Sequence, residues 1–248
     1  ILLLAYTNRA VDEICSSLDS LEPAINYIRI GSELSCDERF REKLVENVLI
    51  SFDNRSDVRQ CLSACRVYVG TVASISSKPE LFKLKHFDVA IIDEATQILE
   101  PQLLWILTAK SSDGQHAVDK FVLIGDHKQL PAVVLQNKES SEVYDEGLRN
   151  IGLYNLKDSL FERLYRFHLQ EEDSSALDML CKQGRMHPDV ASFPNQAFYG
   201  GKLQPIGLPH QLEKLDTPVL FIPSRKDHQS VSGKTNQDEA KMAADLAE

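Results

Sequence analysis

The sequence predicts an α/β protein with a parallel β-sheet that carries helices on both faces. Its first half contains five short segments that are apolar along almost their whole length, as strands buried on both faces are. The segments between them repeat apolar residues every three or four positions, which is typical of amphipathic helices. This alternation indicates βαβ units in a doubly wound sheet. The expected strands are residues 1–5, 27–30, 67–70, 87–92 and 121–124.

Three helices are expected between these strands. Residues 10–21 and 97–108 place an apolar side chain on one face in every turn. Residues 37–52 predict another amphipathic helix, which we expect to belong to a helical insertion at about residues 32–66, between the second and third strands. The side chains expected on its buried face are Phe40, Leu44, Val45, Val48 and Leu49.

The second half of the chain predicts a loop, a helix and a linker. Residues 136–150 are polar and acidic, which is typical of a loop or lid. Asp158 or Ser159 is expected to cap a helix that runs to about residue 167. The charged segment 168–175 is the expected linker between two domains. These domains would comprise residues 1–168 and 169–248.

Two further elements are expected after the linker. Residues 188–199 have a helical pattern, which Pro194 is expected to end or kink because proline has no backbone N–H to donate. Residues 219–222 are apolar and predict one more short buried strand.

The composition limits the class of protein. Lys and Arg number 27 against 37 Asp and Glu, a net charge of −10, so a nucleic-acid site would have to be a local surface. No apolar run approaches the ~18 residues of a membrane-spanning helix, and residues 1–6 lack the basic start of a secretory signal. The five cysteines have neither CxxC nor zinc-site spacing and are expected to be free thiols. We therefore expect a cytoplasmic protein, or a nuclear one in a eukaryote.

An acidic pair follows the fourth expected strand. Asp93 and Glu94 would lie at the carboxyl edge of a parallel sheet, where open α/β folds bind ligands. One carboxylate can hold a hydrated Mg²⁺ while the other orients or deprotonates a water molecule. The alternative is that the two acids only stabilise the N-terminus of the following helix.

Polar residues also follow the fifth expected strand and the linker. Gly125 permits a tight turn, and Gln129 carries an amide that can contact a phosphate or a positioned water. Arg185 carries a guanidinium that can donate two hydrogen bonds to phosphate oxygens. Each of these residues, taken singly, is also compatible with an ordinary loop or surface position.

Taken in order, these segments resemble motifs II, III and IV of the superfamily 1 helicases, closest to the branch that includes the nonsense-mediated-decay helicase. The matching residues are 93–97 (DEATQ), 125–131 (GDHKQLP) and 183–188 (QGRMHP). Residues 5–12 resemble motif Ia, and residues 69–74 resemble the next motif that contacts nucleic acid. Residues 236–240 resemble a late helical motif. The resemblance covers almost the whole chain. It implies a RecA-like parallel-sheet domain with a helical insertion, followed by the beginning of a second RecA-like domain.

The resemblance implies a role for individual residues in ATP hydrolysis at a cleft between two domains. Asp93 would bind the Mg²⁺ of Mg-ATP, Glu94 would activate the attacking water, and Gln129 would couple the γ-phosphate to the nucleic acid. Arg185 would act as an arginine finger from the second domain. The remaining implied contacts are those of Asp126 and Glu239 with the nucleotide, and of Thr7, Asn8 and Thr71 with the backbone of a single strand of nucleic acid.

The chain departs from the family pattern in two places. It contains no GxxxxGK followed by Ser or Thr, the loop that cradles phosphates in such ATPases. Since that loop precedes motif Ia in the family, we expect residues 1–248 to be a piece of a longer chain and to be inactive as an ATPase alone. Without the strand before the loop, we expect two strands with unpaired edges along an apolar gap. Gly184 stands where the family usually has an aromatic residue, which affects the packing around Arg185.

Three functions remain open from the sequence. The parent protein is expected to be an ATP-dependent helicase or translocase on single-stranded nucleic acid, with DNA and RNA both open because a phosphate grip does not read the sugar. The alternatives are a degenerate nucleic-acid-binding module without catalysis, and a different Mg-dependent hydrolase that uses Asp93 and Glu94. A local basic cluster, which is either a nucleic-acid surface or a solvated face, comprises Lys78, Lys83, Lys85 and His86.

Overall fold

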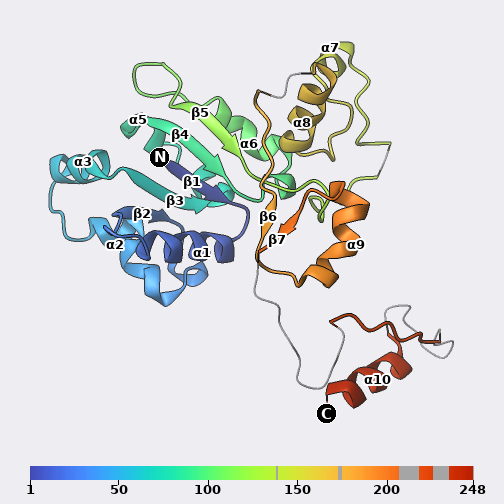
Figure 1. The fold of residues 1–248 in the computed structure, drawn as a ribbon. Helices are drawn as coiled ribbons and strands as arrows, with labels where there is room; N and C mark the ends of the chain where they lie inside the picture. The colour runs from blue at the N-terminus through green and yellow to red at the C-terminus, as the bar shows by residue number, and fades with distance from the viewer. Residues whose placement is uncertain (138, 173–174, 207–217, 226–234, 248) are drawn as a thin grey trace. The chain divides into compact units, whose positions relative to one another are not determined.

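The computed structural model of the protein describes residues 1–137, 139–172, 175–206, 218–225 and 235–247 (Figure 1). The chain forms two compact units, Ile1–Leu177 and Asp178–Glu248. The first unit contains a five-stranded sheet and the second contains a two-stranded sheet. No helix in these described ranges is both long enough and apolar enough to span a membrane.

The five strands of the first unit are parallel, in the order β2-β3-β1-β4-β5, which confirms the predicted α/β class. Their bounds are β1 (Leu2–Ala5), β2 (Tyr27–Ile30), β3 (Val67–Thr71), β4 (Phe87–Ile92) and β5 (Val118–Leu123). Four strands lie where the apolar runs predict them. β5 begins three residues earlier than expected because Val118 already pairs with Phe87, and the ladder passes through the exposed Asp119 and Lys120. The exposed residues Asp119 and Lys120 interrupt the apolar pattern, so the apolar run marks only the second part of this strand.

Helices cover both faces of this sheet (Figure 1). Alternate residues of β1 belong to different cores: Leu2 and Leu4 pack into one, whereas Leu3 and Ala5 pack into the other. The core of Leu3 and Ala5 is completed by α1 (Asn8–Asp19). The opposite core is completed by α4 (Val72–Ser76), α5 (Leu81–Leu84), α6 (Glu100–Leu107) and α8 (Leu160–Gln170). This is the predicted doubly wound arrangement.

The sheet is continuous across its centre. β1 pairs with β3 on one side, with Leu3 opposite Val69, and with β4 on the other, with Leu3 opposite Ile91. The expected gap with two unpaired strand edges is therefore wrong, because each neighbour satisfies the backbone groups of β1. Within the described residues the sheet ends at β2 and β5, so any further strand could join it only at one of these two edges.

The insertion between β2 and β3 is helical, but the prediction of one helix over residues 37–52 is wrong. It contains two 3₁₀ helices and two α-helices: η1 (Glu33–Ser35), η2 (Glu38–Lys43), α2 (Val45–Leu49) and α3 (Arg55–Ala64). The break falls at Leu44, which is extended with ψ 136°, is 1% exposed, and forms a backbone bridge with Arg29 of β2. Docking Leu44 against the edge of the sheet requires this extended residue, so the tertiary contact overrides the helical period.

The segment after β5 contains one short helix, α7 (Glu146–Asn150), within the predicted loop 136–150. Of the two candidate caps of the next helix, Ser159 is the N-cap, since its Oγ accepts a hydrogen bond from the Glu162 N–H at 3.2 Å. α8 then continues to Gln170, so it occupies the first residues of the segment predicted as a linker.

The second unit contains β6 (Lys182–Gln183), β7 (Gln204–Pro205), α9 (Pro188–Tyr199) and α10 (Gln237–Ala247). α9 continues through Pro194 instead of ending there. The predicted strand at residues 219–222 is wrong, because these residues pair with no strand among the described residues and Phe221 is 87% exposed. A short apolar run forms a strand only where a neighbour satisfies its backbone hydrogen bonds.

Candidate active site

Two loops of the first unit meet at the carboxyl edge of the sheet. The backbone ladder between β4 and β5 continues past both strands: Ile124 N–H donates to the Ile92 carbonyl and Ala95 N–H donates to the Ile124 carbonyl, both at 2.8 Å. Asp93 N–H donates to the Leu4 carbonyl of β1, also at 2.8 Å. The loop that carries the acidic pair and the loop that carries Gln129 are therefore held side by side by the main chain.

Gly125 allows this close approach. A Cβ atom at position 125 would lie 2.9 Å from the Thr96 methyl carbon and 3.1 Å from the Thr96 backbone nitrogen. The sequence suggests that position 125 is glycine because of its backbone dihedrals in a tight turn. The structure shows that glycine is required because the neighbouring loop lies too close for a Cβ atom.

We expect Gly125→Ala to destabilise the first unit by about 1–3 kcal/mol, because the added methyl group forces the two loops apart. Urea unfolding of the purified protein measures the difference. Gly31→Ala is the matched control, since its Cβ would meet no atom closer than 3.9 Å. Equal unfolding midpoints for the two variants would contradict the explanation.

Asp93 and Glu94 lie directly after β4 and are both half-buried. Glu94 adopts the left-handed conformation, with φ 53° and ψ 36°, which costs about 1–3 kcal/mol for a residue with a side chain. Its N–H donates to Asp93 Oδ1 and its Oε2 accepts from Gln97 Nε2, both at 2.9 Å. The left-handed turn and the Gln97 contact thus set the direction of the Glu94 carboxylate, while Asp93 Oδ2 is the oxygen that can face a cation.

Gln129 is held by a compact turn after β5. Asp126 Oδ1 accepts from Lys128 N–H at 2.9 Å, and Asp126 Oδ2 accepts from Gln129 Nε2 at 2.8 Å. The backbone N–H of Gln129 donates to the Asp126 carbonyl at 3.1 Å. Asp126 therefore organises the turn and orients the exposed Gln129 amide.

The side chain of His127 leaves this turn and packs on α8. Its ring lies 4.4 Å from the Tyr165 ring and 6.5 Å from the Phe161 ring, measured between centroids. Burial lowers the pKa of His127, and the neighbouring Lys128 charge lowers it further. This contact was not predicted, because its partners are separated by more than thirty residues of sequence.

The predicted nucleic-acid residues lie at the same edge of the sheet, where β1 and β3 end. Thr7 caps α1, with its Oγ1 accepting from Ala10 N–H at 3.2 Å, and Asn8 is the first residue of that helix. Thr71 forms a capping box with Ser74 at the start of α4 and is only 6% exposed. Helix N-termini present unpaired N–H groups, which suit phosphate oxygens. The Thr71 Oγ1 accepts from the Ser74 N–H at 3.0 Å, so its hydroxyl retains its own hydrogen for donation, beside the backbone donors of the first turn of α4.

Arg185 and Glu239 belong to the second unit. Arg185 is exposed in a loop that Gln183 holds together, since Gln183 Nε2 donates to the Met186 carbonyl at 3.1 Å and Gln183 Oε1 accepts from Met186 N–H at 2.9 Å. A Cβ at Gly184 would meet no atom within 4 Å. Glu239 lies in the first turn of α10, where its N–H donates to the capping Asn236 Oδ1 at 3.2 Å.

The basic cluster does not join this edge. Lys83, Lys85 and His86 come just before β4, at the amino ends of the parallel strands. Lys85 Nζ donates to the Ser63 carbonyl at 2.6 Å, and His86 Nε2 lies 3.0 Å from Asp119 Oδ1. Lys78 Nζ likewise donates to Glu46 Oε1 at 2.5 Å, so Lys78, Lys85 and His86 are paired locally, as on a solvated face.

Asp93 is not part of a preformed metal-ligand cluster. In the described part of the chain, three potential ligand residues have their ligand atoms within 4.8 Å of one another. They are His86, Asp88 and Asp119, at the amino end of the sheet. Magnesium keeps several waters and is bound by one or two carboxylates together with substrate phosphates. A half-buried Asp93 beside helix N-termini fits such a site, in which the nucleotide supplies the remaining ligands.

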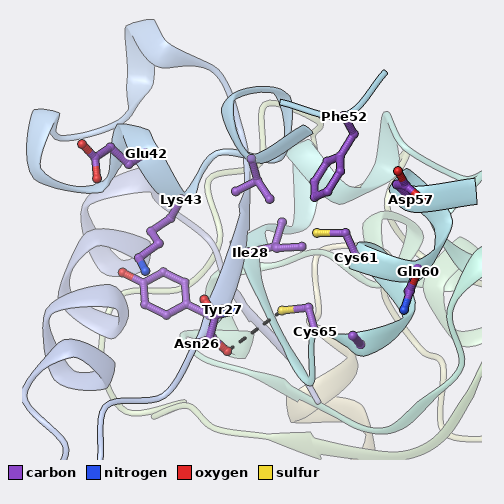
Figure 2. Close-up of a pocket in the computed structure, with 12 residues that line it drawn as sticks. Asn26, Tyr27, Ile28, Glu42, Lys43, Phe52, Asp57, Gln60, Cys61 and Cys65 are labelled. Carbon is purple, nitrogen blue, oxygen red and sulfur yellow. Dashed lines mark hydrogen bonds between the residues drawn. The ribbon is translucent and has the colours of Figure 1, made fainter. Parts of the chain in front are cut away.

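A separate hollow of about 540 Å³ lies between the start of β2 and the insertion (Figure 2). Phe52, Cys61 and Cys65 line it, and burial raises the pKa of the Cys65 thiol. None of the predicted site residues lines this hollow. Its size is in the range of small-molecule pockets, but its walls carry no group that the sequence motifs identify.

Comparison with known proteins gives the family of this chain. A family described as AAA domain matches residues 49–137, and a second family with the same description matches residues 156–248. The chain is 33% identical over 203 residues to the DNA replication ATP-dependent helicase/nuclease JHS1 of Arabidopsis thaliana, which covers 82% of this chain and 13% of that protein. It is 30% identical over 228 residues to the DNA replication ATP-dependent helicase/nuclease DNA2 of Bos taurus, covering 92% of this chain and 18% of that protein. Identity to the uncharacterized ATP-dependent helicase MJ0104 of Methanocaldococcus jannaschii is 32% over 166 residues, which is 66% of this chain and 20% of that protein.

The parallel sheet, the acidic pair at its carboxyl edge and these matches define helicase domains of the P-loop NTPase class. The chain belongs to the superfamily 1 helicases, in the branch that contains the nonsense-mediated-decay helicase and the DNA2-like proteins. It spans an eighth to a fifth of the length of these curated relatives.

Proposed function

We propose that this chain supplies part of a motor that uses ATP hydrolysis to move along single-stranded nucleic acid. The observation that supports the proposal is the main-chain pairing of two loops, which brings Asp93, Glu94 and Gln129 to one edge of the sheet. A simple hydrolase needs the acidic pair alone. An ordered glutamine beside it suits a site that also responds to the terminal phosphate.

Each residue has a proposed task at this site. Asp93 holds the Mg²⁺ of Mg-ATP, which neutralises phosphate charge when bound. Glu94 accepts a proton from the attacking water, and Gln129 contacts the γ-phosphate or that water. The sequence motif implies that Asp126 contacts the nucleotide. In the proposed site Asp126 acts on the nucleotide indirectly, by keeping Gln129 oriented.

The second unit and the strand ends supply the remaining proposed groups. Arg185 stabilises the charge that develops on the phosphate, and Glu239 contributes to nucleotide binding. Thr7 and Asn8 contact the nucleic-acid backbone at the start of α1, and Thr71 contributes by ordering the start of α4. Since none of these groups reads bases, the contact is independent of sequence.

We further propose DNA as the track, because the relatives from Arabidopsis thaliana and Bos taurus carry names of DNA replication helicases. We also propose that residues 1–248 alone do not hydrolyse ATP, because their sequence contains no GxxxxGK loop to hold the phosphates.

The test is the ATPase rate of the protein that contains this chain, with and without single-stranded DNA or RNA. The proposal expects stimulation by single-stranded DNA, and Asp93→Ala should abolish turnover while the matched surface variant Asp53→Ala retains it. Binding of nucleic acid without turnover would instead support a degenerate binding module. Turnover that nucleic acid leaves unchanged would support a different Mg-dependent hydrolase.

A further inference from the structure

One helix, α8, contacts both loops of the candidate active site. It packs against the 3₁₀ helix η3 (Ala95–Gln97), which directly follows Glu94. It is also joined to α6 by a buried two-pronged ion pair, in which Arg163 Nε and Nη2 donate to the Glu100 carboxylate at 2.7 and 2.5 Å. The acidic loop and α8 thus form one connected body.

The loop that carries Gln129 touches the same helix through the His127 side chain. Phe161 and Tyr165 lie four residues apart on one face of α8, with their rings parallel to within 9°. The His127 ring lies against Tyr165 at 4.4 Å, with an angle of 37° between the ring planes. Charged groups near this imidazole are Asp126, Lys128, Glu162 and Arg166.

We infer that Tyr165 is a positioning residue for Gln129, acting through His127. The inference rests on the proposed function, since it assumes that Gln129 faces the nucleotide. The turn at residues 126–129 is closed by hydrogen bonds to Asp126, so it moves as a unit. The main-chain pairing at Ile124 holds the start of this loop, and the packing of His127 on Tyr165 adds a second tether beyond it, which holds the turn against α8. When this contact is lost, the turn is no longer held against α8, and the hydrogen bonds of the Lys128 and Gln129 amides to Asp126 open more often.

The packing of His127 on Tyr165 is also suited to couple the Gln129 loop to α8. Both rings are only half-buried, so the packing can be changed without opening the core. The Glu100–Arg163 pair and the buried Leu160 hold α8 in place independently of Tyr165. A change at Tyr165 should therefore alter the Gln129 loop before it alters the fold.

The experiment compares Tyr165→Ala with Tyr165→Phe in the protein that contains this chain. The control is Leu169→Ala, on the same helix and 56% exposed. Hydrogen exchange at the Lys128 and Gln129 amides reports the loop, and the ratio of nucleic-acid-stimulated to basal ATPase reports coupling. For Tyr165→Ala we expect faster exchange at both amides and a stimulated kcat about tenfold lower, with KM for ATP within about twofold. Tyr165→Phe, which keeps the ring, should behave as the unaltered protein.

Several outcomes overturn the inference. Unchanged exchange in Tyr165→Ala, or a Phe variant as defective as the Ala variant, would show that ring packing at Tyr165 does not position the loop. Faster exchange without loss of stimulation would show that the position of the loop does not affect coupling, which also overturns the inference. If Tyr165→Ala does not fold, His127→Ala removes the same contact from the side of the loop and should give the same changes. His127→Phe keeps an aromatic ring at this position and should behave as the unaltered protein. An unaltered protein without ATPase activity would defeat the proposed function, whereas the exchange measurement would still decide whether Tyr165 places the loop.

Discussion

Replacing Glu94 with Gln is expected to lower the ATPase rate of the protein that contains this chain by about 10²–10⁴-fold, the usual contribution of a general base. The substitution keeps the size of the side chain and removes only its ability to accept a proton. The amide oxygen of Gln can still accept the hydrogen bond from Gln97 Nε2, so the left-handed turn at position 94 should be preserved. Binding of Mg-ATP should therefore remain.

Steady-state turnover and nucleotide-binding measurements on the same preparation test this prediction. Glu80→Gln serves as the control, because Glu80 is an exposed residue at the start of α5, away from the motifs. A Glu94→Gln protein that retains more than half of its turnover would exclude Glu94 as the base. Equal loss of nucleotide binding would instead indicate a role in holding the nucleotide.

Asp12→Ala is expected to destabilise the first unit by about 3–5 kcal/mol, the usual cost of leaving a buried charge without its partner. Arg29 of β2 is 1% exposed, and its Nη1 donates to Asp12 Oδ1 of α1. The nearest further contact of Nη1 is the Cys15 Sγ at 3.9 Å, and Arg29 Nε has no hydrogen-bond partner in the structure. Asp12 is thus the group that balances this guanidinium, and it also ties α1 to the sheet.

Urea unfolding followed by circular dichroism measures this effect. Arg9→Ala removes an exposed ion pair with Glu13 on the same helix and should leave the unfolding midpoint nearly unchanged. The double variant Asp12→Ala/Arg29→Met should recover part of the loss, because an apolar side chain replaces the unpaired charge. A double variant no more stable than Asp12→Ala would show that the loss comes from packing of α1 rather than from the buried charge.

The strands were the most predictable part of the fold. Strands that are buried on both faces are largely apolar, so β1 to β4 are visible as apolar runs. β5 was placed three residues late because an edge strand can include exposed residues such as Asp119 and Lys120. The apolar run at residues 219–222 was misassigned for the opposite reason, since no neighbouring strand accepts it among the described residues.

The place where a helix is interrupted depends on tertiary contacts, which the apolar period of the sequence does not reveal. The apolar period over residues 37–52 is real, but Leu44 leaves the helix to form a bridge with Arg29. Local propensities differ by about 1 kcal/mol or less for most residues, so a single well-packed tertiary contact can outweigh them.

The sequence by itself determined the succession of β1 to β5 along the chain and the residue types at their ends, because apolar runs and polar termini are local properties of the chain. It therefore identified Asp93, Glu94 and Gln129 as candidates. Only the tertiary structure decided which groups lie together: the close approach of Gly125 to Thr96, the packing of His127 on Tyr165, and the pairing of Arg29 with Asp12. These contacts join segments that are distant in the chain, and they form only when packing of the sheet and helices has brought those segments side by side.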